Sequence, residues 1–368
     1  MQSVLIPCSR AVDRWICTPL QSRYHFHDQD LASMPDPMVQ LRSAQQWKQH
    51  HPNGVVLATH DLAAPIAAHC MGHPSVHAVF TTMDKAATRE QLDPKPIPFC
   101  RLDPGQAMPP QTDFPYPALL KPRDGWGSQQ ITPIKTPGLA PLEIDAPLTP
   151  LWQALLPSSS HTQSGWLLEQ YMEHQHIFTV DGFVQDGEVQ LWGISENLYA
   201  TSNPLLLEGC LFPAQLDDAL TQKLESAYKA VVYPLIEQGF DRSFINAEFF
   251  MTSDQEIILM EINGRLPIIL TPLYRCTLTG GDSVEAAIQL ALDQQVVRPK
   301  QPNGVAGAFF IQGQASPALT QCPQNDHLLL LSPPPVTGRL GTLILHAQDR
   351  HQLLRQWRQW QQQHLILA

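Results

Sequence analysis

The stretch INAEFFM-TSDQ-EIILMEINGR, residues 245–265, is typical of two β-strands joined by a tight turn. The two flanking runs are rich in β-branched and aromatic residues, and the four residues between them, 252–255, favour a turn. Apolar and polar side chains alternate along both runs, as expected when one face of a hairpin is buried. The pattern therefore predicts a β-hairpin with one apolar face and one polar face.

The turn determines the register that we expect for this hairpin. With residues 252–255 in the turn, Met251 lies opposite Glu256, and Ala247 lies opposite Met260. Side chains that point to the predicted apolar face are Ile245, Ala247, Phe249, Met251, Ile258, Met260 and Ile262. This face is expected to pack against the core of the protein.

The polar face of the hairpin carries the first candidate functional residues. Asn246, Glu248, Glu261 and Asn263 point to this side, and Glu248 and Glu261 are predicted to be diagonal neighbours on adjacent strands. Two carboxylates and an amide oxygen are ligands that suit Mg²⁺. Arg265 follows on the same side. The alternative is a simple solvated face, because antiparallel sheets often expose one polar side to water.

Composition narrows the class of protein. The chain has 368 residues, enough for two or three domains, and 43% of them are hydrophobic. Acidic residues exceed basic ones, so that the net charge is −11, which argues against nucleic acid or an anionic membrane as partner. No apolar run approaches a membrane span, and residues 1–10 do not resemble a secretory signal. The seven dispersed cysteines fit reduced thiols, so we expect a cytoplasmic protein.

Other segments read as alternating strands and helices. Residues 1–80 resemble a small α/β layer, with strands expected at 4–6, 54–58 and 75–80 and a helix at 62–70. A helix is expected at 83–92 with Asp84 as its N-cap, followed by a Pro-rich linker at 94–114. The remaining expected strands are 118–122, 130–134, 166–172, 177–183 and 188–194, and the remaining expected helices are 216–238, 282–292 and 348–362.

The metal-type hairpin belongs to a longer series of motifs. Glu248 followed by MEINGR at 260–265 resembles the metal motif of the ATP-grasp superfamily, which is a Glu on one strand and Glu-x-Asn-x-Arg on the next. Further motifs resemble those of the superfamily and occur in the same order: DK at 84–85, LKP at 120–122, GxGS at 125–128, LEQYM at 168–172, TVDG at 179–182 and TGGD at 279–282. The resemblance covers residues 80–300 best.

This resemblance implies a role for each matched residue. The metal ligands would be Glu248, Glu261 and Asn263, and Arg265 would be the catalytic residue that stabilises charge on the transferring phosphoryl group or on an acyl phosphate. The residues implied in nucleotide binding are Lys85, Lys121, Gly125, Gly127 and Ser128 at the phosphates, Glu169, Gln170, Tyr171 and Met172 at adenine, and His176 at ribose. The implied cofactors are ATP and two Mg²⁺ ions, with Mn²⁺ as an alternative metal.

The implied fold is an α+β ATP-grasp fold, in which two α+β lobes clasp ATP behind a small N-terminal α/β domain. We expect an N-terminal domain at 1–82, a linker helix and small lobe at 83–165, a large lobe with the metal site at 166–300 and the rest of the large lobe at 301–368. The resemblance is closest to single-chain carboxylate–amine ligases that join amino acids. It implies a carboxylic acid and an amine as substrates, an acyl-phosphate intermediate and a homodimer.

Several alternatives remain within the resemblance. They are a biotin-carboxylase-like or purine-pathway enzyme, an ATP-grasp kinase, and an ATP-binding module without catalytic activity. Gln130 stands where many relatives have a further loop glycine, so we expect a stiffer loop. Residues 266–269, LPII, replace glycines found around the acceptor in many amino-acid ligases, and Arg275 is a candidate partner for a substrate carboxylate.

Overall fold

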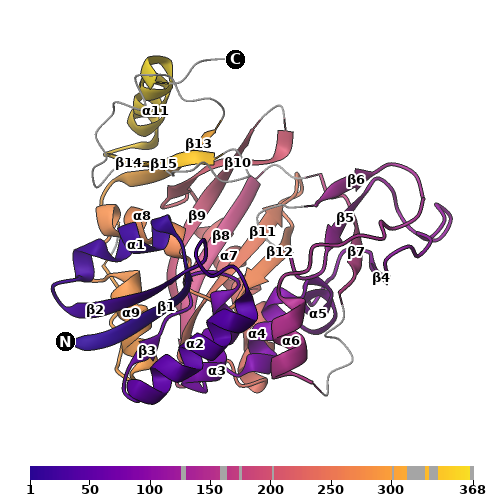
Figure 1. Cartoon of the computed structure of the whole chain (residues 1–368). Helices are drawn as coiled ribbons and strands as arrows, with labels where there is room; N and C mark the ends of the chain where they lie inside the picture. The colour runs from indigo at the N-terminus through magenta and orange to yellow at the C-terminus, as the bar shows by residue number, and fades with distance from the viewer. Residues whose placement is uncertain are drawn as a thin grey trace.

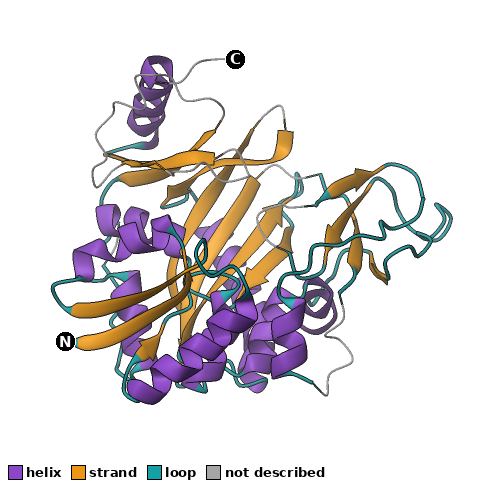
Figure 2. Cartoon of the chain, in the orientation of Figure 1, coloured by secondary structure: helices purple, strands orange, loops and turns teal. Residues whose placement is uncertain are grey.

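Three β-sheets organise the part of the chain that the computed structural model describes, with helices packed between and around them (Figures 1 and 2). The described residues are 1–125, 130–157, 164–173, 176–200, 203–300, 302–312, 328–330 and 339–364. Gly127, Ser128 and His174 lie outside these ranges. The architecture is the α+β arrangement expected from the sequence, with an N-terminal α/β layer ahead of two lobes. The domain bounds given above stay a prediction.

The N-terminal layer is a small parallel sheet with helices. Its strands are β1 (Gln2–Ser9), β2 (Tyr24–Asp30) and β3 (Val55–Val56), in the order β2-β1-β3. Its helices are α1 (Ala11–Cys17), the short 3₁₀ turn η1 (Thr18–Leu20), α2 (Pro37–His50) and α3 (Ala63–Met71). The strands expected near 4–6 and 54–58 and the helix near 62–70 are thus confirmed. Figure 1 shows this layer beside the central sheet.

The strand expected at 75–80 is wrong, because this segment is helical. Helix α4 (Val76–Met83) begins at Ser75, whose hydroxyl accepts a hydrogen bond from the backbone N–H of Ala78 at 3.0 Å. Short apolar runs do not distinguish a buried strand from a buried helix by periodicity. The third strand of the layer is instead β2, whose polar sequence YHFHDQD carries little strand signal.

The small lobe is a four-stranded antiparallel sheet. Its strands are β4 (Phe99–Leu102), β5 (Ala118–Pro122), β6 (Thr132–Ile134) and β7 (Trp166–Gln170), in the order β4-β7-β5-β6. Helix α5 (Lys85–Gln91) leads into it, and α6 (Thr149–Leu155) packs between it and the N-terminal layer. β4 lies inside the segment expected to be a linker. Its pairing with β7, rather than its own sequence, makes it a strand.

The large lobe is built on an eight-stranded sheet with antiparallel pairing. Its strands are β8 (His176–Gln185), β9 (Glu188–Ala200), β10 (Asn203–Phe212), β11 (Ser243–Met251), β12 (Ile257–Asn263), β13 (Val305–Gln312), β14 (Leu328–Leu330) and β15 (Arg339–Ala347). The order across the sheet is β12-β11-β8-β9-β10-β13-β15-β14. The two residues between β8 and β9, Asp186 and Gly187, both have positive φ, at 55° and 76°, which a tight hairpin turn of this type requires.

Helices cover this sheet and close its core. They are α7 (Asp218–Glu237), the 3₁₀ turn η2 (Ile268–Leu270), α8 (Thr271–Thr277), α9 (Ser283–Ala291) and α11 (Arg350–His364). α7, α9 and α11 confirm the three helices expected in this half of the chain. The core on one side joins α7 to α3, α4 and the apolar side chains of β11 and β12. In the described ranges, no helix combines the length and the apolar character needed to cross a membrane.

The β11–β12 hairpin forms as expected, but its register is different. Met251 pairs with Ile257 and Phe249 with Leu259, whereas Glu248 pairs directly with Glu261. A bulge between these positions leaves one extra residue on β12, Met260. The expected apolar face is therefore corrected: Leu259 belongs to the buried core, and Ile258 and Met260 do not. The bulge turns the two glutamates from diagonal neighbours into opposite ones.

Candidate active site

The polar face of the large sheet carries two rows of polar side chains at the β8–β11–β12 end. Asp181, Asn246 and Asn263 lie opposite one another across the three strands, and Thr179, Glu248 and Glu261 form the next row. Residues that are directly paired point to the same face of a sheet. We call Asp181, Asn246, Glu248, Glu261 and Asn263 the acidic face. The structure thus brings together all three residues that the sequence assigned to metal binding.

The acidic face holds more negative charge than the neighbouring side chains balance. Burial and the charge of Glu261 raise the pKa of Glu248 to about 8. Glu248 accepts a hydrogen bond from the Asn197 amide at 3.1 Å, and Glu261 lies 3.9 Å from the ammonium of Lys85. Asn197, on β9, is a site residue that the sequence analysis missed. An oxygen-rich set of two carboxylates and an amide fits Mg²⁺, which would offset this charge.

Lys85 joins the acidic face to the base of the glycine-rich loop. It is the first residue of α5, whose N-cap Asp84 accepts from the Ala87 N–H at 2.8 Å, as expected. The Lys85 ammonium donates to the carbonyl of Gly125, and its backbone N–H donates to the carbonyl of Arg123 at 2.8 Å. Arg123 also forms an ion pair with the N-cap Asp84, with 2.5 Å between Nη2 and Oδ2. Gly127 and Ser128 of the predicted loop lie outside the described residues.

Gln130 shows how the chain leaves this loop without the additional glycine. Its φ is 57°, in the left-handed region that glycine adopts most readily. The Gln130 side chain accepts a hydrogen bond from the backbone N–H of Asp145 at 2.9 Å. The stiffer loop stays a prediction.

Lys121 belongs to a buried group of charges that we call the paired cluster: Arg89, Asp93, Lys121 and Glu169. Lys121, on β5, contacts one oxygen of Glu169, on β7, and Arg89 Nε lies 2.6 Å from the other. Arg89 also donates to the backbone carbonyls of Leu259 and Met260, on β12, at 2.8 and 2.9 Å. Burial alone would raise the pKa of Glu169, but Lys121 and Arg89 lower it. Arg89, which the sequence analysis missed, therefore ties the small lobe to the metal hairpin.

The predicted adenine segment follows Glu169 at the end of β7. Glu169 is 2% exposed, and each of its two carboxylate oxygens forms an ion pair, one with Arg89 and the other with Lys121. The backbone N–H groups of Gln170 and Tyr171 donate to the carbonyls of Pro98 and Pro117, both at 2.9 Å. The N–H groups of Gln170 and Tyr171 therefore already have hydrogen-bond partners inside the small lobe. Met172 follows them as the last residue of the predicted adenine segment.

His176 lies at the start of β8, where it pairs with Met251 of β11. Its Nδ1 is 3.2 Å from Glu196 on β9, and its ring stacks on Phe178 with 5.8 Å between the centroids. Glu196 also pairs with Arg350, the first residue of α11. The local sequence does not indicate this contact of Glu196, because its partner Arg350 lies 154 residues farther along the chain.

Arg265 is held from the N-terminal layer. Its Nε lies 2.7 Å from Oδ1 of Asp61 and its Nη2 3.4 Å from Oδ2. Burial opposes ionisation of Asp61, but the Arg265 guanidinium outweighs it and lowers the pKa of this carboxyl to about 2. A planar guanidinium suits such two-point pairing with a carboxylate. Nothing in the local sequence around Asp61 indicated this contact.

Asp181, in the acidic face, and Arg275, on α8, are both held by neighbouring groups. Asp181 accepts hydrogen bonds from the Asn246 amide, at 2.6 Å, and from the Tyr274 hydroxyl; burial raises its pKa to about 7. Arg275 pairs with Asp282 at 2.5 Å and donates to the Ile16 carbonyl at 2.6 Å. Its side chain therefore connects α8, α9 and α1, which weakens its candidacy as a carboxylate partner for a substrate.

Comparison with known proteins agrees with this geometry. Residues 114–268 match the family model of the ATP-grasp domain. This segment contains Lys121, the predicted adenine segment at the end of β7 and the whole β11–β12 hairpin. None of the curated proteins matches the sequence significantly.

Solved structures show the same fold over nearly the whole chain. The L-amino acid ligase from Bacillus licheniformis has a TM-score of 0.72 at 13% identity, with 100% of this chain and 99% of that chain covered. Carboxyaminoimidazole ribonucleotide synthase from Aspergillus clavatus, complexed with ATP, has a TM-score of 0.69 at 14% identity and 96% coverage of both chains. The biotin carboxylase domain of the Hydrogenobacter thermophilus 2-oxoglutarate carboxylase, a dimer in complex with MgADP, has a TM-score of 0.66 at 14% identity, with 100% and 90% covered. The match to the family model identifies residues 114–268 as an ATP-grasp domain, and the whole chain has the fold of the solved structures named above.

Proposed function

We propose that the protein is an ATP-dependent carboxylate–amine ligase that joins two small molecules, of which amino acids are the first candidates. The single observation that carries the proposal is the meeting of two motifs at one contact. Lys85 Nζ, from the phosphate side, lies 3.9 Å from Glu261 Oε1, from the metal side. This contact supports the proposal, because phosphoryl transfer requires a cation for the phosphate oxygens next to the carboxylates that hold the metal ion.

The first step would activate the acid. An oxygen of the substrate carboxylate attacks the γ-phosphorus of ATP, the bond to the bridging oxygen of ADP breaks, and an acyl phosphate forms. Lys85 and Lys121 would neutralise charge on the nucleotide phosphates, and Arg265 would stabilise charge on the transferring group. Glu248, Glu261 and Asn263 would hold Mg²⁺, which supplies charge neutralisation at the phosphate oxygens when it is bound.

The second step would form the amide. The amine nitrogen attacks the acyl carbon, inorganic phosphate leaves with the electrons of the carbon–oxygen bond, and the nitrogen loses a proton. No side-chain nucleophile is needed, because the phosphoryl group has already activated the carboxylate. A closed site protects the acyl phosphate from water, so that ADP accumulates only when an amine captures it.

A matrix of substrates tests this proposal. Amino acids are supplied singly and in pairs with ATP and Mg²⁺, ADP release is measured, and products are identified by mass spectrometry. We expect ADP release that requires both an acid and an amine, and an amide product. Glu256→Gln, at the exposed turn of the same hairpin, serves as a matched control for Glu261→Gln.

The same matrix separates the alternatives. A stable phosphorylated product without any amine requirement would indicate a kinase, and bicarbonate dependence would indicate a carboxylase. Tight ATP binding without turnover on a broad panel would indicate a binding module and would contradict the proposal. A homodimer and a cytoplasmic location belong to the proposal as well; light scattering of the purified protein tests the former.

A further inference from the structure

The Asp61–Arg265 pair joins two parts of the molecule that are far apart in the sequence. Arg265 follows the metal strand β12, and Asp61 follows β3 of the N-terminal layer, 204 residues earlier. Two guanidinium nitrogens face two carboxylate oxygens, at 2.7 and 3.4 Å. Such a two-point contact fixes the plane of a guanidinium as well as its distance.

The segment that carries Asp61 is itself held on both sides. The Leu57 N–H donates to the Leu5 carbonyl at 2.9 Å, which continues the pairing of β3 with β1. The Leu266 N–H donates to the Ala58 carbonyl at 3.2 Å, so that the two segments also share a main-chain hydrogen bond. Asp61 is 5% exposed. The carboxylate is therefore a rigid, buried support for the residue next to it.

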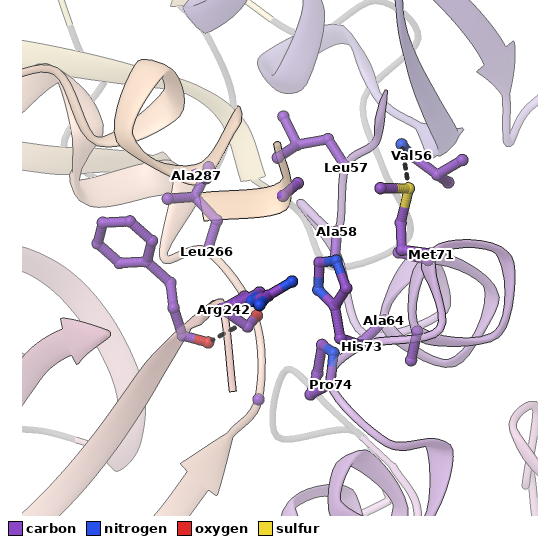
Figure 3. A pocket seen from close by; sticks show the side chains of 16 residues that line it. Val56, Leu57, Ala58, Ala64, Met71, His73, Pro74, Arg242, Leu266 and Ala287 are labelled. Carbon is purple, nitrogen blue, oxygen red and sulfur yellow. Dashed lines mark hydrogen bonds between the residues drawn. The ribbon is translucent and has the colours of Figure 1, made fainter. Parts of the chain in front are cut away.

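A small cavity lies at the seam between the N-terminal layer and the large lobe. Its volume is about 40 Å³, and Leu266, the residue after Arg265, is part of its lining. In Figure 3, Ala58, Ala64 and Met71 of the N-terminal layer line one side of this cavity, and Leu266 and Ala287 of the large lobe line the other. Arg265 itself does not line this cavity. Its guanidinium is instead held by the two hydrogen bonds to Asp61.

The charge partners of Arg265 compete with one another. The charges that act on Arg265 are Asp61, then Glu261, then Glu248. The last two are the proposed metal ligands. Without Asp61, the guanidinium would turn toward the acidic face, where it would compete with a metal ion for the same carboxylates.

We propose that Asp61 is a positioning residue for Arg265: it binds the Nε–Nη2 edge of the guanidinium and so directs the other edge toward the transferring phosphoryl group. This inference rests on the proposed function. It makes the N-terminal layer a working part of the active site and not only a neighbour that packs against it. It also predicts that loss of Asp61 harms turnover and metal affinity more than ATP affinity.

The first test uses Asp61→Asn, with Glu285→Gln as a matched control. Glu285 pairs with Arg23 at 2.5 Å across the same boundary between the N-terminal layer and the large lobe, but away from Arg265. We expect kcat of Asp61→Asn to fall about tenfold to a hundredfold, as for a displaced catalytic group, and the Mg²⁺ concentration for half-maximal activity to rise. KM for ATP should stay nearly constant. A kcat equal to that of Glu285→Gln would overturn the proposal.

Chemical rescue distinguishes positioning from simple stabilisation. Arg265→Ala should regain part of its activity when guanidinium ion is added at concentrations far below those that unfold the protein. Asp61 should hold this ion in place of the side chain. The double variant Asp61→Asn/Arg265→Ala should therefore show no rescue, and equal rescue in both backgrounds would contradict the proposal.

A measurement without turnover separates this inference from the proposed function. In protein labelled with ¹⁵N-arginine, the Arg265 Nε–H resonance is assigned by its loss in Arg265→Lys. It should be protected from exchange with water in the wild type and in Glu285→Gln, and lose that protection in Asp61→Asn. Unchanged protection in Asp61→Asn would overturn the pairing even if ligase activity were present. Absence of ligase activity with this protection pattern would contradict only the proposed function.

Discussion

The paired cluster and the acidic face are both built from charged side chains, yet they balance charge in opposite ways. In the paired cluster, burial opposes ionisation of Glu169, but its two cationic partners, Lys121 and Arg89, outweigh burial and lower its pKa. In the acidic face, Glu248 lies opposite a second carboxylate and its pKa is raised to about 8. A carboxylate such as Glu169, whose charge is balanced by cations of the chain itself, helps to hold the lobes together. Two adjacent carboxylates such as Glu248 and Glu261, whose charge is not fully balanced, favour binding of an additional cation.

The largest effect should come from removing the central cation of the paired cluster. Arg89→Met leaves Glu169 partly unpaired and two β12 carbonyls without their donor, so the free energy of unfolding should fall by about 3–5 kcal/mol. Urea denaturation measures it. Arg101→Met, which removes a surface pair with Glu90, should cost less than about 1 kcal/mol. If Arg89→Met and Arg101→Met lowered the free energy of unfolding equally, the paired cluster would not have the stabilising role that we assign to it.

A substitution in the acidic face should lower the activity of the protein and not its stability. Glu261→Gln removes one proposed metal ligand, and turnover at saturating Mg²⁺ should fall about a hundredfold to a thousandfold because charge at the phosphoryl group is less well offset. Stability without metal should not decrease, since repulsion with Glu248 is relieved. Steady-state ADP release and thermal unfolding measure the two effects. Near-normal turnover would contradict the metal assignment.

Lys121 should combine both kinds of behaviour. Lys121→Ala removes a charge partner of buried Glu169 and a proposed phosphate contact, so ATP affinity should weaken by about 1.5–3 kcal/mol, roughly tenfold to a hundredfold. Isothermal titration calorimetry with ATP measures the change, and acceptor affinity should change less. Lys95→Ala, at an exposed position, is the control. Unchanged ATP affinity would leave Lys121 a purely structural member of the paired cluster.

The last prediction concerns the pH dependence of stability at Asp181. Its pKa is raised to about 7 in the folded protein, so the folded state binds more protons than the unfolded state between roughly pH 4 and pH 7. Wild-type stability should therefore lose up to about 1.4 kcal/mol per pH unit from this residue as pH rises through that window. Asp181→Asn lacks this loss, so its stability relative to wild type should grow with pH. Parallel urea midpoints from pH 4 to pH 8 would contradict it.

Local patterns in the sequence predicted the elements that have a local cause. Alternation along residues 245–263 predicted the hairpin, and Asp84 predicted the start of α5, because an N-cap bonds to N–H groups two or three residues away. The order of the motifs predicted the fold, and residue types alone placed Glu248, Glu261 and Asn263 on one face of the sheet. None of these inferences needs a contact between distant segments.

Tertiary structure decided the features that depend on distant partners. The strand at β4, the helix at α4 and the bulge that sets Glu248 opposite Glu261 arise from pairing and packing that short sequence windows do not contain. Arg89 meets the carbonyls of β12 from 170 residues away, and Asp61 meets Arg265 from 204. A charged side chain takes whichever partner the fold brings within a few ångströms, and periodicity along the chain carries no information about which one that is.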